Sequence, residues 1–111
     1  MINTYIKKNV TKEWLLKNEF RYNRFFSTKE DTVYTYRFPV VYIKGKNKVS
    51  IECELLLYYP EGNVYINVYY AGTRDKYAPY YNNEYGDWSK MLSTINNRID
   101  SKLKKLGIIT L

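Results

Sequence analysis

The sequence contains no histidine and a single cysteine among its 111 residues. Without imidazole groups there is no Ser-His or Cys-His catalytic pair, no histidine metal ligand and no general base that titrates near neutral pH. Cys53 alone forms neither an internal disulfide nor a cysteine zinc site, and such low cysteine usage is typical of the reducing cytoplasm. These absences predict a cytoplasmic protein that is not an enzyme and that has no metal or other cofactor.

Long apolar runs are also missing, and alanine occurs only twice. The longest apolar run, Leu55 to Tyr59, is far shorter than the roughly 20 residues that span a bilayer, so we expect no membrane contact. By contrast, Lys, Asn, Ile and Tyr make up 47 of the 111 residues. Because their codons are rich in A and T, we expect the source to be a phage, plasmid or other mobile element of an AT-rich bacterium.

The chain is long enough for one domain, which we expect to span residues 1–111, and its formal net charge of +7 is unevenly distributed. Residues 1–50 carry a net +7, residues 51–87 a net −4 and residues 88–111 a net +4. If the two basic ends meet, they form a patch for a polyanion. Alternatively, they pair with the acidic middle through ordinary surface ion pairs, and codon bias accounts for part of the lysine excess.

Alternation of apolar or aromatic side chains with other residues predicts β-strands in the middle of the chain. Three segments have this period of two: residues 32–42, 49–57 and 64–69. Turn residues separate them, so we expect two successive antiparallel hairpins. Pro39 has no N–H for a ladder and should lie at an edge, a bulge or a strand start. Cys53 shares the apolar face of the central strand, so we expect a buried, unreactive thiol.

Helical periodicity predicts one helix on each side of these strands. Thr11 should cap the first helix, which we expect to run to about Asn23. Asp87 should cap the second helix and Gly107 should end it. The apolar stripe of the second helix comprises Trp88, Met91, Leu92, Ile95, Ile99, Leu103 and Leu106. After it, Ile108, Ile109 and Leu111 should pack back onto the core.

These elements predict an α+β fold in the order α-β-β-β-(β)-α. We expect an antiparallel meander of three to four strands, packed on one face by two helices and exposed to water on the other. The candidate fourth strand is residues 77–81, within a long irregular segment from Ala71 to Gly86. Long loops of this kind in compact domains are often functional.

Nucleic acid is the first candidate partner, because lysines cluster at the turn 44–48 and on the polar face of the last helix. The predicted contact residues are Lys44, Lys46, Lys48, Lys90, Arg98, Lys104 and Lys105. Tyr65 and Tyr69 on the outer sheet face are candidates for stacking on unpaired bases. Glu52 and Glu54 lie on the same face, however, and would repel phosphates. Each basic group also has the simpler interpretation of solvated surface.

A protein partner is the alternative, because tyrosine is favoured at protein interfaces and 14 of the 111 residues are tyrosine. In this interpretation the chain is an interaction module, an inhibitor of a host protein or a homodimer. The predicted interface residues are Tyr77, Tyr80, Tyr81 and Tyr85. The competing interpretation of these rings is an aromatic lid that covers the open end of the sheet.

Overall fold

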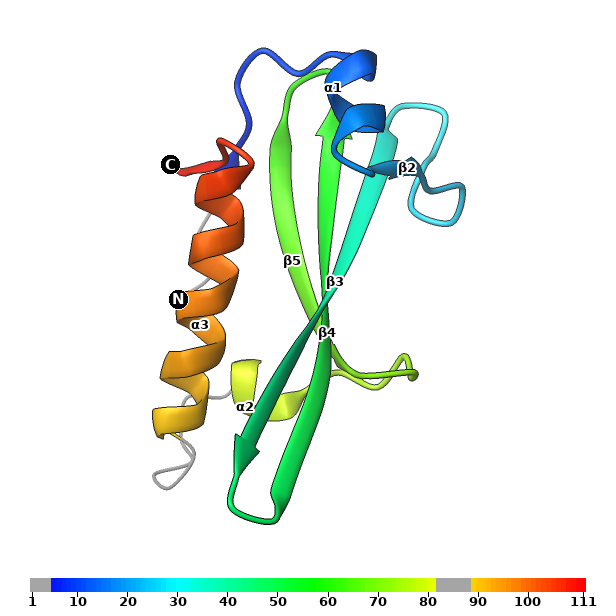
Figure 1. The fold of residues 1–111 in the computed structure, drawn as a ribbon. Coiled ribbons are helices and arrows are strands. Elements are labelled where there is room, and N and C mark those ends of the chain that lie inside the picture. Colours follow the sequence, from blue (N-terminus) through cyan, green and yellow to red (C-terminus); the bar gives the residue numbers. More distant parts are fainter. Residues whose placement is uncertain (1–4, 82–88) are drawn as a thin grey trace.

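The structure, a computed structural model, describes residues 5–81 and 89–111 of the chain. Its elements are, in chain order, β1 (Tyr5–Ile6), α1 (Lys12–Lys17), β2 (Arg21–Tyr22), β3 (Thr32–Lys44), β4 (Asn47–Tyr59), β5 (Asn63–Tyr70), α2 (Ala78–Tyr81), α3 (Ser89–Lys105) and β6 (Ile109–Thr110). Figure 1 shows a twisted sheet with α3 along one face and α1 at one end. The predicted α+β class is confirmed.

The described strands form one sheet in the order β2-β3-β4-β5-β1-β6, and all neighbouring pairs are antiparallel. The central strands β3, β4 and β5 are the predicted meander. The sheet nevertheless has six strands rather than three to four, and the element order differs from the predicted one. The additional strands β1, β2 and β6 are two residues long, which is too short to leave a periodic pattern in the sequence.

β3 and β4 pair over their full lengths, which leaves Gly45 and Lys46 for the turn between them. Gly45 has φ +59°, as tight two-residue hairpin turns require. The odd-numbered residues of β4 from Ile51 to Leu57 are all buried, as the alternation predicts. Cys53 is one of them, and burial, with a smaller effect of the Glu52 charge, raises the pKa of its thiol to about 12.

Beyond its short pairing with β2, β3 forms an open edge of the sheet. Among the described strands, β2 is its neighbour on that side and pairs with Tyr34 and Thr35. On this side the Val33 carbonyl accepts a hydrogen bond from the Asn23 N–H, and alternate residues of a strand direct their backbone groups the same way. Pro39 is six residues after Val33, so its nitrogen, which carries no hydrogen, also faces the open edge. No hydrogen bond of the sheet is lost there. Of the three predicted positions, an edge, a bulge or a strand start, Pro39 occupies an edge.

α3 packs its apolar stripe on the inner face of the sheet, the face that bears the odd-numbered residues of β4. The buried stripe residues are Leu92, Ile95, Ile99, Leu103 and Leu106. Gly107 then ends the helix with φ +71°, its N–H donating to the Lys104 carbonyl while the Ile108 N–H donates to the Leu103 carbonyl. The predicted apolar stripe of this helix is confirmed from Leu92 onward, and so is the end of the helix at Gly107. The predicted cap and first stripe residues, Asp87, Trp88 and the side chain of Met91, lie outside the described part.

α1 is shorter than predicted. Thr11 caps it as expected, its Oγ1 accepting from the Trp14 N–H at 3.0 Å. The helix ends at Lys17 and does not continue to residue 23, because Glu19 adopts a left-handed backbone with φ +66°. The chain then pairs with β3 as β2. α1 consequently lies at the end of the sheet (Figure 1), whereas two helices side by side on one face were expected.

The two ends of the chain complete the sheet beside β5. β1 pairs with β5 on one side and with β6 on the other. The predicted fourth strand at 77–81 is wrong, since residues 78–81 form α2. Of the three C-terminal residues expected to pack on the core, Ile108 is buried, whereas Ile109 and Leu111 are exposed.

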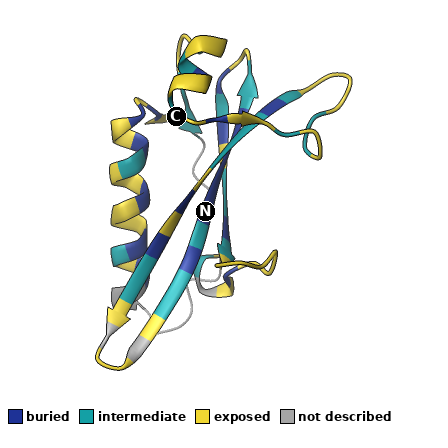
Figure 2. Cartoon of the chain, turned by 45° about the vertical axis from the view of Figure 1, so that its right-hand side comes forward, coloured by how far each residue is buried: buried dark blue, intermediate teal, exposed yellow. Residues whose placement is uncertain are grey.

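The outer face, opposite α3, is only partly exposed to water. Val33, Glu54 and Leu56 lie on it and are buried. Figure 2 shows that buried and half-buried residues follow one another along much of the central strands. The expectation of a wholly wet outer face is therefore wrong. The buried Glu54 is the most consequential of the three residues, because a carboxylate without water needs partners.

Candidate nucleic-acid interface

The basic residues predicted to bind nucleic acid form two separate clusters. Lys46 and Lys48 are exposed at the β3–β4 hairpin, and Lys104 and Lys105 are exposed in the last turn of α3. Figure 1 places these two sites at opposite ends of a molecule whose longest dimension is 43 Å. The structure therefore does not bring all the predicted residues together. The side chains of Lys44 and Lys90 lie outside the described part.

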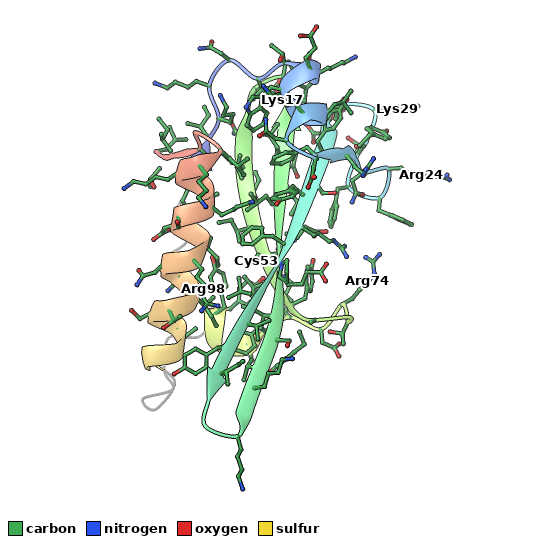
Figure 3. The ribbon with its side chains drawn as sticks, in the orientation of Figure 1. Lys17, Arg24, Lys29, Cys53, Arg74 and Arg98 are labelled. Atoms are coloured by element: carbon green, nitrogen blue, oxygen red, sulfur yellow. The ribbon has the colours of Figure 1, made fainter. Side chains whose placement is uncertain are left out.

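Arg98, from the middle of α3, has a structural contact. Its guanidinium donates a hydrogen bond to the carbonyl of Val41, on the open edge of β3 (Figure 3). An unpaired edge carbonyl invites pairing with a foreign strand, and Arg98 occupies this one. The contact accounts for Arg98 without a nucleic-acid partner, so we do not retain it as a contact residue.

The pairing of β1 with β6 brings the basic ends of the chain together. Lys7 directly follows β1, and a Cβ added to Gly107 would lie 3.9 Å from the Lys7 Nζ. The Lys7 side chain thus lies against the end of α3, whose last turn is rich in lysine. We call this group the terminal basic cluster, and it comprises Lys7, Lys8, Lys102, Lys104 and Lys105.

Aromatic rings, rather than carboxylates, hold the ammonium groups at this end of the molecule. Three lysines lie over rings: Lys7 over Trp14 at 4.9 Å, Lys12 over Tyr59 at 5.9 Å and Lys102 over Tyr36 at 5.1 Å. Such contacts orient an ammonium group without neutralising it. Within residues 5–81 and 89–111, the ion pairs are those of Arg37 with Glu52 and Glu54. The described lysines therefore do not dock the basic ends onto the acidic middle by ion pairing.

Arg37 offsets part of the negative charge of Glu52 and Glu54 on the outer face. Its Nε donates to Glu54 Oε2 at 2.7 Å, and its Nη1 donates to Glu52 Oε1 at 3.3 Å. The Tyr69 hydroxyl donates to Glu54 Oε1 at 3.3 Å; burial and then the Glu54 charge raise the pKa of Tyr69. The predicted repulsion of phosphates by these carboxylates is thus weakened. Tyr65, which is 46% exposed, remains accessible for stacking.

The tyrosines predicted as an interface lie mainly against the edge of β5. Tyr77 is 2% exposed, and its N–H donates to the Val68 carbonyl at 2.9 Å. The Tyr81 hydroxyl accepts from the Val68 N–H at 2.9 Å, so both backbone groups of Val68 have partners. Tyr80 is half-buried, and burial is the largest cause of its raised pKa. This arrangement favours the lid interpretation for Tyr77. An interface role for the exposed Tyr81 stays a prediction. Tyr85 lies outside the described residues.

Neither a metal-binding cluster nor a membrane-spanning helix is present in residues 5–81 and 89–111. No three Cys, Asp or Glu side chains there are grouped so as to hold a metal ion. No helix in residues 5–81 and 89–111 has the length and apolarity needed to cross a membrane. No family of known proteins, no curated protein and no solved structure matches this chain.

Lys7, Lys8 and Lys102 are not among the contact residues predicted from the sequence. The available signal was the positive net charge of both terminal segments. The missing information was that β1 pairs with β6, because two-residue strands have no recognisable periodicity. The pairing turns two separate charge excesses into one surface.

Proposed function

We propose that this chain is a small, non-enzymatic, cytoplasmic nucleic-acid-binding protein of a mobile element, and that the terminal basic cluster is its main contact surface. The observation that carries the proposal is the gathering of five lysines from both ends of the chain with no ion pair among the described residues. A polyanion that meets such a cluster releases its condensed counterions, which supplies most of the affinity in sequence-independent binding.

Lys46 and Lys48 at the hairpin tip are a second, weaker contact in this proposal. They lie at the far end of the molecule, beyond the acidic strand residues Glu52 and Glu54. Lysines contact phosphates as flexible point charges and carry no sequence information in such contacts. We therefore expect binding with little sequence preference.

A protein partner is the second candidate, favoured by exposed rings such as those of Tyr22, Phe25 and Tyr65. Exposed tyrosine and arginine are the residue types that dominate binding energy at protein interfaces. The partner would be a host protein that the chain inhibits, or a second copy of the chain. Binding of this kind depends much less on salt than binding to a nucleic-acid backbone.

The proposal is tested by the salt dependence of binding to labelled duplex DNA and duplex RNA of mixed sequence. We expect binding at low salt. The logarithm of the association constant should then fall linearly with the logarithm of the salt concentration. On duplex DNA the slope is about 0.9 for each phosphate neutralised, so five lysines set an upper limit of about 4 to 5 for the terminal basic cluster. If neither duplex is bound at low salt, and no single strand of the same sequence is bound either, the nucleic-acid proposal is wrong and the protein partner is favoured.

A further inference from the structure

The side of the molecule opposite α3 carries exposed aromatic and basic side chains that the terminal basic cluster does not include. Figure 3 shows Arg24, Lys29 and Arg74 projecting on this side. We call the group the outer patch, and it comprises Arg21, Arg24, Phe25, Lys29, Tyr65 and Arg74. We propose that the outer patch binds an unpaired stretch of nucleic acid, with the Phe25 ring stacking on a base. This inference rests on the proposed nucleic-acid function and specifies the form of the ligand.

The chemistry of residues 21–29 suits this ligand. The segment reads Arg-Tyr-Asn-Arg-Phe-Phe-Ser-Thr-Lys, with three cations, three aromatic rings and no acidic residue. Arg21, Arg24 and Lys29 are exposed, and the Phe25 ring is 84% exposed. Cations that contact phosphates and rings that stack on bases are the two components of sequence-tolerant single-strand binding.

The loop that presents Phe25 is held by hydrogen bonds. Asn23 Oδ1 accepts from the N–H groups of Phe25 and Phe26 at 2.9 and 3.1 Å. Ser27 Oγ donates to the Asn23 carbonyl at 2.6 Å and accepts from the Val33 N–H at 2.9 Å. The loop is therefore anchored to β3 at both Asn23 and Ser27. The fixed backbone presents a large apolar ring to solvent, where it is accessible to a ligand.

Arg74 and Tyr65 extend the surface around Phe25. The Arg74 guanidinium lies 5.8 Å from the centre of the Phe25 ring, although Phe25 follows β2 and Arg74 follows β5 in the chain. Arg21 lies opposite Thr35, and Leu56 lies opposite both Thr35 and Tyr65, so these four residues form one row across the outer face. At about 4.8 Å between neighbouring strands, the backbones of Arg21 and Tyr65 lie roughly 14 Å apart.

The carboxylates on this side limit the net charge. Glu52 and Glu54 are paired with Arg37, but Glu30, Asp31 and Asp75 are exposed. Charge alone therefore gives this side little affinity for a duplex, whose bases are stacked inside. A single strand adds base stacking on Phe25, which alanine substitution typically shows to be worth a factor of about 5 to 150 in affinity. A preference for unpaired nucleic acid follows.

The test compares a labelled single strand of mixed sequence with the same strand in a duplex, by fluorescence anisotropy at fixed salt. We expect Phe25→Ala to weaken single-strand binding about tenfold or more, and duplex binding less than about twofold. Phe25→Tyr keeps an aromatic ring and should bind the single strand as the unchanged protein does. Leu16→Ala is the control, because Leu16 is an exposed apolar residue (68%) of α1 outside the outer patch. It should change neither affinity.

Equal single-strand affinity of Phe25→Ala and the unchanged protein would overturn the inference, and so would equal loss for both ligands. If the duplex binds with the salt dependence described above, the proposed function survives that result; if neither nucleic acid binds, both proposals fail. Self-association that Phe25→Ala abolishes, without any change in single-strand binding, would assign the ring to a contact between two copies and would also overturn the inference. Thermal unfolding of each variant verifies that it is folded.

Discussion

At the scale of single residues, Glu54 is the side chain whose environment differs most from its sequence pattern. Alternation places it on the outer face, where a carboxylate is expected in water, yet it is completely buried. Arg37 lies directly opposite on β3, and Tyr69 reaches Glu54 from β5. The burial of Cys53 was predictable because it depends on its own strand. The burial of Glu54 was not, because it depends on which residues of two other strands lie beside it.

The Arg37–Glu54 pair gives a prediction about stability. Arg37→Leu leaves the Glu54 carboxylate buried without its cation, and we expect the free energy of unfolding to fall by about 3 kcal/mol in chemical denaturation. Glu52→Gln is the matched control, because it removes the more exposed partner of the same arginine and should cost less than about 1 kcal/mol. Similar small losses in both variants would show that Glu54 does not depend on the pair.

At the scale of elements, the long ones were predictable and the short ones were not. β3, β4, β5 and α3 have enough residues for a period of 2 or 3.6 to appear. The first helix was overextended because Phe20 continues the helical spacing, whereas the left-handed backbone at Glu19 had no signal in the sequence. β1 and β6 were missed for lack of length, and their pairing positions the terminal basic cluster.

Gly62 connects the N-terminal segment to the meander. It has φ +94°, its carbonyl accepts from the Lys7 N–H at 2.9 Å, and a Cβ at this position would lie 2.1 Å from the Lys7 carbonyl oxygen. We expect Gly62→Ala to displace β1 and to lower the free energy of unfolding by about 3 kcal/mol or more. Gly45→Ala, also at positive φ but with nothing within 4 Å, should cost about 1 kcal/mol. Equal losses by thermal unfolding would contradict the close approach of Lys7.

At the scale of the whole molecule, the charge distribution along the chain became interpretable once the fold was known. The sequence indicated two basic ends and an acidic middle, but left open whether the ends meet. Antiparallel pairing of β1 with β6 shows that they do, and Lys7 and Lys102 lie over aromatic rings rather than beside carboxylates. Lys46 and Lys48 are exposed, as predicted, whereas their distance from Lys104 and Lys105 required the three-dimensional arrangement.

The raised pKa values of four tyrosines and Cys53 predict how stability depends on pH. Burial raises the pKa of Tyr69, Tyr77, Tyr80 and Tyr81 above 10.0 and that of Cys53 above 9.0. A folded-state pKa above the unfolded value means that the folded state binds more protons, so stability is complete below about pH 9 and falls as the pH rises through 10 and beyond. Chemical denaturation at pH 7, 9, 10 and 11 measures this. Constant stability from pH 9 to 11 would contradict the burial of these groups.

The central claim is that the terminal basic cluster binds nucleic acid, and charge reversal at the two ends of the molecule tests it most directly. The two variants are Lys104→Glu with Lys105→Glu, and Lys46→Glu with Lys48→Glu, which make the same change of charge at exposed positions. On duplex DNA, we expect the first variant to lose about tenfold or more in affinity at low salt and about 2 units of the salt slope, and the second to lose clearly less. Equal losses, or no loss in the first variant, would contradict the claim.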